Sequence, residues 1–175
     1  MDSTKPEAVK EFLRELGSGI SNPVTLEIGG SIALILAGYL SRSTEDIDVV
    51  NEVPPPLRRE QQLLEKLQRR YRLVLTHFQS HYLPSGWENR LQFQGSFGLL
   101  KVYAVDVYDT FLGKLFSARE KDLDDLRAIK PHLDKGQLSR KLLDTTSSFL
   151  KDPLLRRSAE KNWYILFGDD LPSQE

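Results

Sequence analysis

The order of hydrophobic and polar residues predicts alternating helices and strands in the first half of the chain. Apolar residues three and four apart indicate helices, and short or alternating apolar runs indicate strands. In chain order the pattern predicts a helix at 6–16, a strand at 24–28, a buried helix from Ser31 to about Gly38, a strand at 47–50, a helix at 57–70 and a strand at 72–78.

The second half begins with a hairpin pattern and is then helical. Two alternating runs within 90–107 meet at glycines in 95–98, which is typical of a β-hairpin. Amphipathic patterns then predict one long helix at 110–129 and two more at 136–150 and 154–167. Strands mixed with helices, and further helices at the end, indicate an α+β fold in which helices flank a mixed sheet.

The length of 175 residues suits one domain that buries its own core. We expect this domain at 1–167, with a core at about 24–130, C-terminal helices at 136–167 and a disordered tail at 168–175. The chain has no Cys, which excludes thiol nucleophiles and cysteine-based metal sites. It has no apolar run near the roughly 20 residues of a membrane span. Because its charged first residues lack a secretory signal pattern, the expected location is cytoplasmic.

The candidate chemistry lies between the first and second predicted strands. Asp46 and Asp48 are alternate residues of a strand, so both carboxylates point to one face. Like charges at this spacing are costly unless a cation lies between them, and Mg²⁺ binds carboxylate oxygens together with substrate phosphates. Gly29 and Gly30, just before the buried helix, let backbone N–H groups approach a phosphate closely.

Each half of this motif also has a plainer explanation. Two adjacent glycines often form an ordinary tight turn, and an Asp-x-Asp pair can protect a sheet edge from pairing. The order and spacing of the two halves favour a site for a metal-bound triphosphate.

With these residues the sequence resembles the DNA polymerase β-like nucleotidyltransferase superfamily. That superfamily shares a hydrophobic residue, Gly, and Gly or Ser, then a helical spacer and an Asp-hydrophobic-Asp strand, as in Ile28-Gly29-Gly30 and Asp46-Ile47-Asp48. The longer pattern, with Ser31 after the glycines and Arg42-x-Thr44 before the Asp pair, is similar to small bacterial nucleotidyltransferases related to the AbiEii abortive-infection toxins. The resemblance implies a minimal nucleotidyltransferase fold.

A second match lies downstream. Lys114-Leu115, followed by REKDLDDL at 119–126, is similar to a helix of that group with a Lys and an Arg/Lys-Asp-x-x-Asp element. By resemblance Asp122 or Asp125 takes the downstream acidic role, and of the two we expect Asp122 to be catalytic.

The resemblance implies roles for the other matching residues. Asp46 and Asp48 are the expected Mg²⁺ ligands and catalytic residues, and an NTP is the expected substrate. In such enzymes the metal ions stabilise both the attacking oxygen and the leaving pyrophosphate. The residues expected to contact the triphosphate are Gly29, Gly30, Ser31, Arg42, Thr44 and Lys114, of which Lys114 is also expected to be catalytic.

The downstream charges have a structural explanation as well. If 110–129 is one helix, its core-facing leucines place Arg119 within the apolar arc and Asp122 beside it. Buried charges three residues apart can simply pair with each other. An ion pair and a catalytic role are therefore both open for these residues.

Many members of the superfamily carry a third carboxylate on a later strand, opposite the Asp pair. We expect that position in the strand at 90–94, which contains no acidic residue. The nearest substitutes are Glu88 and Asp106, and Asp106 equally suits a helix N-cap. The missing carboxylate bears on catalysis more than on nucleotide binding.

The net charge of −1, from 24 Lys and Arg against 25 Asp and Glu, argues against a protein that coats nucleic acid through bulk charge. The helix at 57–70 is nevertheless locally basic, and a solvated face is favoured there over an RNA-binding patch. His77 and His81 have no acidic neighbour in sequence, so a metal role for them is not favoured.

The sequence thus predicts a Mg²⁺-dependent nucleotidyltransferase. It would transfer a nucleoside monophosphate from an NTP to a hydroxyl of RNA, protein or a small molecule. The resemblance also implies a toxin–antitoxin setting with a partner protein. The alternative is a catalytically silent protein of the same fold that acts as a binding partner or antitoxin.

Overall fold

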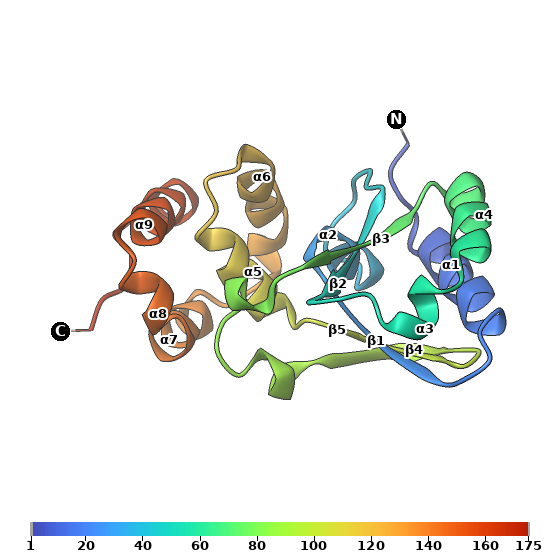
Figure 1. Ribbon diagram of the computed structural model, residues 1–175. Coiled ribbons are helices and arrows are strands. Elements are labelled where there is room, and N and C mark those ends of the chain that lie inside the picture. The colour runs from blue at the N-terminus through green and yellow to red at the C-terminus, as the bar shows by residue number, and fades with distance from the viewer. Residues whose placement is uncertain (1, 175) are drawn as a thin grey trace. The chain divides into compact units, whose positions relative to one another are not determined.

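The computed structural model describes residues 2–174, so Met1 and Glu175, the outer ends of the predicted domain and tail, lie outside the described residues. The predicted α+β fold is confirmed, with a five-stranded mixed sheet and flanking helices (Figure 1). The chain forms two compact units. We call residues 2–80 and 90–105 the sheet unit, and residues 81–89 and 106–174 the helical unit.

All five strands belong to the sheet unit, in the order β3-β2-β1-β5-β4. Their bounds are β1 Val24–Gly29, β2 Asp46–Val50, β3 Val74–Phe78, β4 Gln92–Phe97 and β5 Leu100–Ala104. The central strand β1 is antiparallel to β2 and parallel to β5. β3 runs parallel to β2, and β4 forms the predicted hairpin with β5.

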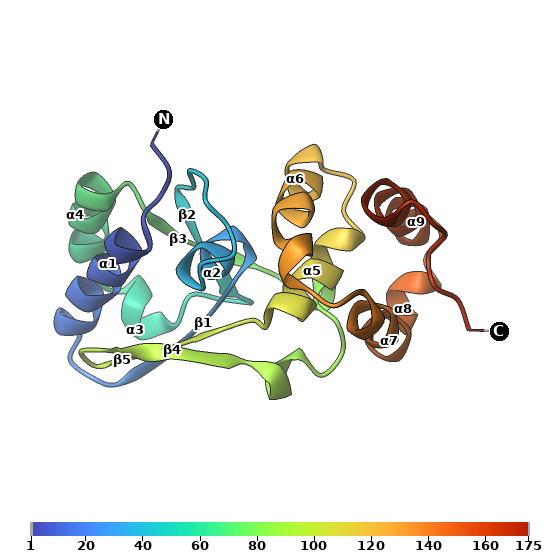
Figure 2. The same cartoon turned by 180° about the vertical axis from the view of Figure 1, so that it is seen from behind.

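The helices of the sheet unit lie on one side of the sheet (Figures 1 and 2). They are α1 Pro6–Ser18, α2 Gly30–Leu36, α3 Pro55–Arg58 and α4 Gln61–Tyr71. The core between helices and sheet includes Leu26, Ile28 and Ile47, all fully buried. Because side chains alternate along a strand, Asp46 and Asp48 point to the opposite face, which these helices leave uncovered.

The helical unit contains α5 Val107–Leu115, α6 Glu120–Ile129, α7 Lys135–Thr145, α8 Ser147–Leu150 and α9 Pro153–Phe167. Helix α5 contacts α6, α7 and α9, and Phe111 of α5 and Trp163 of α9 are fully buried. Short 3₁₀ turns lie at Ser80–Tyr82, Trp87–Arg90 and Lys130–His132.

The helix predicted at 110–129 is interrupted at residues 116–119, so this prediction is wrong. The side-chain amide of Asn162 donates hydrogen bonds of 2.9 Å to the carbonyl oxygens of Leu115 and Ser117. These bonds satisfy carbonyl groups at the end of α5 that a continuous helix would have used. Arg119 consequently precedes α6 with 71% of its side chain exposed, and not in an apolar arc.

Two other predicted helices are also divided. The helix at 57–70 is replaced by α3 and α4, and the one at 136–150 by α7 and α8. Residues 168–174 follow α9 without a further helix or strand. Asp169 in this segment accepts a hydrogen bond of 3.0 Å from Trp163 Nε1. Within residues 2–174, no helix combines the length and apolar character needed to cross a membrane.

Candidate functional site

The Asp pair and the paired glycines meet where β1 ends and β2 begins. The antiparallel register of these strands sets Gly29 beside Asp48. Gly30 has a φ of 64°, in the left-handed region that side chains disfavour. A Cβ atom at Gly30 would overlap the Asp48 carboxylate. The carboxylate of Asp48 therefore lies directly against the Gly30 backbone, and both conformation and space require glycine there.

Asp46 and Asp48 share one face of β2, as their spacing predicts. Asp46 is exposed and Asp48 is half-buried. The Thr76 hydroxyl donates a hydrogen bond of 3.0 Å to Asp48 Oδ1, and Thr76 is the register neighbour of Asp48 on β3. This bond fixes one oxygen of Asp48, while the other oxygen is the one nearest Gly30.

Of the other predicted residues of the sheet unit, Ser31 follows the paired glycines, whereas Arg42 and Thr44 precede β2. Ser31 is buried in the first turn of α2, and its hydroxyl accepts a hydrogen bond from Arg42 Nη2. The Thr44 backbone N–H donates to Thr4 Oγ1 at 2.9 Å, and the Thr4 hydroxyl donates to the Thr44 carbonyl at 3.0 Å. The segment before α1 thus anchors the loop that leads into the Asp pair, across 40 residues of sequence.

The donor set suits a Mg²⁺ ion that is shared with a nucleotide. Mg²⁺ is usually held by one or two carboxylates together with phosphate oxygens and waters. Asp46 and Asp48 supply two such carboxylates on one face of a strand. Among residues 2–174, no group of three or more His, Cys, Asp and Glu side chains could hold a metal. The site therefore fits a metal that arrives with phosphate ligands better than a metal held by protein alone.

The expectation that the segment 90–94 provides the position for a third carboxylate opposite the Asp pair is wrong. Residues 92–94 of that segment belong to β4, which pairs with β5 and is separated from β2 by β1 and β5. The strand beside β2 on its other side is β3, where Thr76 occupies the position next to Asp48. Asp106 belongs to the helical unit and caps α5 by accepting a hydrogen bond of 3.0 Å from the Tyr108 N–H.

Lys114 and Asp122 lie together in the helical unit, within a largely buried ion-pair network. Lys114 Nζ is 2.8 Å from Asp122 Oδ1 and 3.0 Å from Asp125 Oδ2. The exposed fractions of the three side chains are 12%, 12% and 1%. The Ser117 hydroxyl donates to Asp122 Oδ2 at 2.6 Å. The pair predicted between Arg119 and Asp122 is present at 3.6 Å, but Lys114 is the closer partner.

Two opposing effects act on the pKa of Asp122. Burial raises it, but hydrogen bonds from Lys114 and Ser117 and the charges of Lys114 and Arg119 outweigh burial and hold the pKa below its usual range. Asp122 is therefore ionised at neutral pH. Its carboxylate and the Lys114 ammonium stabilise each other structurally, and a part for either residue in a reaction stays a prediction.

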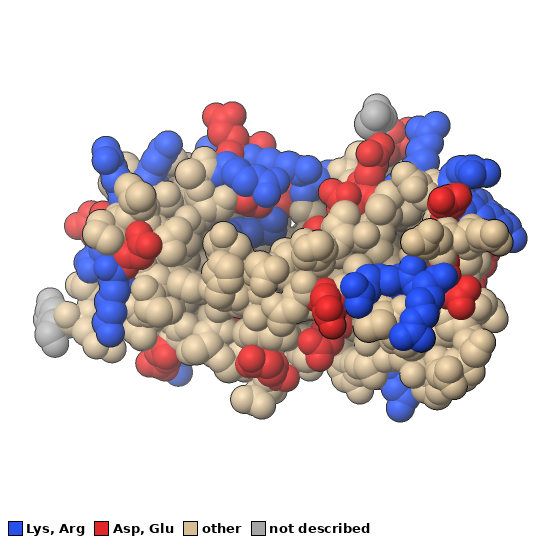
Figure 3. Space-filling model, in the orientation of Figure 1, with Lys and Arg blue, Asp and Glu red and all other residues tan. Residues whose placement is uncertain are grey.

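The locally basic segment of the sheet unit has many of its charges paired. Lys and Arg side chains gather over the region of α3 and α4, with acidic side chains beside them (Figure 3). The ion pairs are Arg58–Glu52, Arg69–Glu65 and Arg70–Glu15. This pairing supports the solvated face that the sequence favours over an RNA-binding patch.

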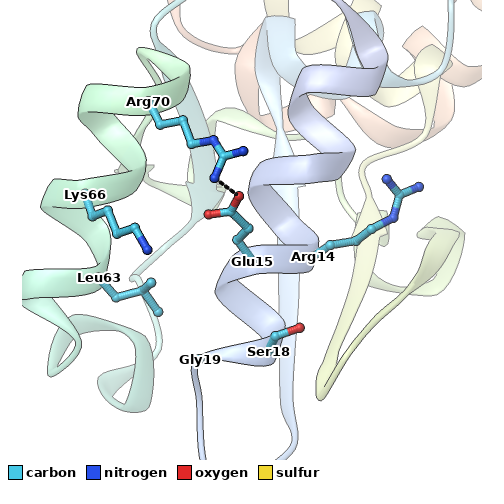
Figure 4. A pocket seen from close by; sticks show the side chains of 7 residues that line it. All are labelled: Arg14, Glu15, Ser18, Gly19, Leu63, Lys66 and Arg70. Atoms are coloured by element: carbon cyan, nitrogen blue, oxygen red, sulfur yellow. Dashed lines mark ion pairs between the residues drawn. The ribbon is translucent and has the colours of Figure 1, made fainter.

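A groove of about 410 Å³ lies between α1 and α4. Its lining residues are Arg14, Glu15, Ser18, Gly19, Leu63, Lys66 and Arg70. In Figure 4, Glu15 points from α1 to Arg70 of α4, whereas Arg14 lies on the far side of α1. The groove therefore does not bring its cations together around one ligand position.

One family model matches residues 7–160, and its description is nucleotidyltransferase of unknown function (DUF6036). The matched segment includes the paired glycines, the Asp pair, Lys114 and Asp122. No curated protein and no solved structure matches the chain significantly. The family match confirms the resemblance to nucleotidyltransferases that the motifs indicate.

Gly30→Ala is expected to lower the free energy of unfolding by about 1–3 kcal/mol for the left-handed backbone alone, and further because its methyl group overlaps Asp48. Gly38→Ala is the matched control, since Gly38 has a φ of 84° and no atom within 4 Å of an added Cβ. Urea unfolding of both variants measures the difference. Equal losses would contradict a close approach of Asp48 to Gly30.

Lys114→Met is expected to lower the free energy of unfolding by about 3 kcal/mol or more, because it removes the ammonium group that lies closest to two buried carboxylates. Arg127→Met, which breaks the exposed pair with Asp124 on the same helix, should lower it by less than about 1 kcal/mol. Thermal and urea unfolding compare the two variants. A small effect of Lys114→Met would show that the network contributes little to stability.

The stabilisation from Asp122 should depend on pH. Its folded-state pKa lies below the unfolded value of about 3.9, so the stabilisation is complete above that value and is lost as pH falls through the folded pKa. The difference in unfolding free energy between the natural protein and Asp122→Asn should therefore shrink as pH falls below about 4. Urea titrations across pH measure this, with the exposed Asp124→Asn as control. A difference that does not change with pH would refute the assignment.

Proposed function

The chain belongs to the DUF6036 family of nucleotidyltransferases of unknown function, and from that premise we propose that it transfers a nucleoside monophosphate from an NTP to a hydroxyl acceptor in a Mg²⁺-dependent reaction. One observation carries the proposal. Asp46 and Asp48 share a face of β2, and Asp48 lies against the Gly30 backbone at the end of β1. Two carboxylates beside a backbone without a side chain suit a metal-bound phosphate.

In the proposed reaction the acceptor oxygen forms a bond to the α-phosphorus of the NTP. The bond from the α-phosphorus to the bridging oxygen breaks, pyrophosphate leaves, and the hydroxyl proton passes to solvent. Asp46 and Asp48 would hold Mg²⁺, which when bound neutralises phosphate charge and aligns the α-phosphate. Thr76 positions Asp48 through its hydrogen bond. Arg42 donates a hydrogen bond to the Ser31 hydroxyl beside the glycine turn, and its guanidinium group would contribute positive charge for the phosphates.

Other parts of the proposal come from the resemblance. By resemblance Lys114 would contact the triphosphate and Asp122 would be a catalytic carboxylate, and both residues lie in the helical unit. Thr44 as a nucleotide contact is supported by its place two residues before Asp46, where its hydroxyl lies 3.4 Å from the Asp46 N–H. The toxin–antitoxin setting and its partner protein rest on the resemblance.

A second candidate is a protein of the same fold that binds NTP without transferring it. Thr76, and not an acidic residue, lies beside Asp48 on β3, and the described residues contain no acidic or histidine cluster of three that could hold a metal. Fewer anionic ligands weaken a second metal position, which transfer requires more than binding does. Calorimetry with an NTP and Mg²⁺ separates the candidates, because binding without turnover supports this one.

The double variant Asp46→Asn, Asp48→Asn should lose transfer by on the order of 100-fold or more, because it removes both proposed metal ligands. The assay supplies each NTP labelled at the α-phosphate, Mg²⁺ and total cell RNA and protein, and measures which macromolecule gains label. Glu45→Gln removes an adjacent exposed acid and should leave labelling unchanged. Equal labelling by the double variant and the natural protein would refute the proposed chemistry.

A further inference from the structure

The face of the sheet opposite α1–α4 carries two aromatic rings on the same side as Asp48. The register places Glu27 of β1 beside Tyr103 of β5, and Tyr103 beside Phe93 of β4. Asp48 is paired with Gly29, two residues along β1 from Glu27. Register neighbours and alternate residues of a strand share a face. Asp48, Glu27, Tyr103 and Phe93 therefore follow one another across four adjacent strands.

The aromatic pair is accessible. The ring centroids of Phe93 and Tyr103 are 5.3 Å apart and the ring planes are tilted by 55°. Phe93 is 58% exposed although it lies within a strand. An exposed aromatic ring can stack on a planar apolar group. The exposed ring of Phe93, next to Tyr103, therefore offers an aromatic surface to a ligand.

The surroundings of the rings are polar. Lys101 lies on the same face, two residues before Tyr103 on β5 and hence roughly 6.6 Å away along the strand. Thr25 and Ser96, the register neighbours of Lys101, are exposed as well. An apolar protein interface would continue beyond the two rings. Two rings beside a cation, in a polar surface, match the alternation of bases and phosphates in a nucleic-acid strand instead.

We propose that Phe93 and Tyr103 stack a nucleobase of a single-stranded nucleic acid, with Lys101 near its phosphate backbone. This inference rests on the proposed function, since it names the acceptor class as a nucleic acid. Stacking on an aromatic side chain is worth about 1–3 kcal/mol per base and tolerates every base, and exposed aromatic residues of a sheet bind unpaired bases in this way.

The position of the Phe93–Tyr103 ring pair on the sheet suits the binding of a nucleic-acid acceptor. Adjacent strands are about 4.8 Å apart, so the ring pair lies roughly 10–15 Å across the sheet from β2. A strand bound at the rings can extend along the same face toward the Asp pair. Lys101 lies on the same face two residues along β5 from Tyr103, so the phosphate contact is expected on the Lys101 side of the rings.

The test measures binding of a fluorescein-labelled single-stranded RNA of mixed sequence to the full chain by anisotropy at low salt. Phe93→Ala should weaken binding by roughly 5- to 150-fold, the equivalent of one lost stacking contact, and Phe93→Trp should retain it. Tyr164→Ala is the matched control, because Tyr164 is an aromatic residue of α9 with 62% exposure. Binding of the same RNA as a duplex should not change with Phe93→Ala, since its bases are already stacked.

Equal RNA affinities of the natural protein and Phe93→Ala would overturn the proposal, as would an absence of RNA binding by the natural protein. If Phe93→Ala instead weakens binding of Mg²⁺-NTP alone, the rings serve the base of the NTP and the acceptor assignment is wrong. Failure of this inference and failure of the proposed function give different results. The Asp46, Asp48 double variant tests nucleotide transfer, whereas the effect of Phe93→Ala on RNA binding tests stacking.

Discussion

Burial of Ile47 and Val49 is the constraint on which the site depends. Both residues are almost fully buried against the helices of the sheet unit, and side chains alternate along β2, so Asp46 and Asp48 must point to the other face. A register slip of one residue would bury both carboxylates and expose both apolar residues, which is strongly unfavourable. The hydrophobic core thereby fixes the direction of the acidic pair without any contact that serves the site itself.

The parts of the site that could be predicted from sequence are local in sequence. Alternation predicts the shared face of Asp46 and Asp48, and adjacent glycines predict the turn beside them. The position next to Asp48 could not be predicted, because Thr76 reaches it through parallel pairing of β3 with β2. An alternating pattern identifies strands but does not give their order in the sheet, so the sequence alone does not distinguish the segment at 90–94 from β3 as the neighbour of β2. In the structure most of that segment belongs to β4, at the other edge of the sheet.

Local sequence patterns also fail to predict where a helix is interrupted by a contact with a distant residue, as the helical unit shows. An apolar pattern continues through residues 110–129, yet Asn162, 47 residues after Leu115, stabilises a break there through two hydrogen bonds. The break brings Ser117 to Asp122 and lets Asp122 meet Lys114 from a separate helix. On one continuous helix, residues eight apart are more than two turns distant and could not pair so closely. The ion-pair network therefore forms because the helix is interrupted, and the amphipathic pattern does not predict this interruption.

Acidic side chains on the sheet face that α1–α4 leave uncovered affect how this face could bind phosphate. Asp46, Asp48 and Glu27 all point to it, and three carboxylates on one sheet face repel a triphosphate. Arg42, which donates a hydrogen bond to Ser31, and Lys101 of β5 contribute positive charge within the same unit. The net charge of −1 for the whole chain does not show that these acidic residues share one face of the sheet. In the proposed function a divalent cation would offset negative charge where phosphate meets Asp48, whereas the neutral base proposed to stack on Phe93 and Tyr103 would need no such cation.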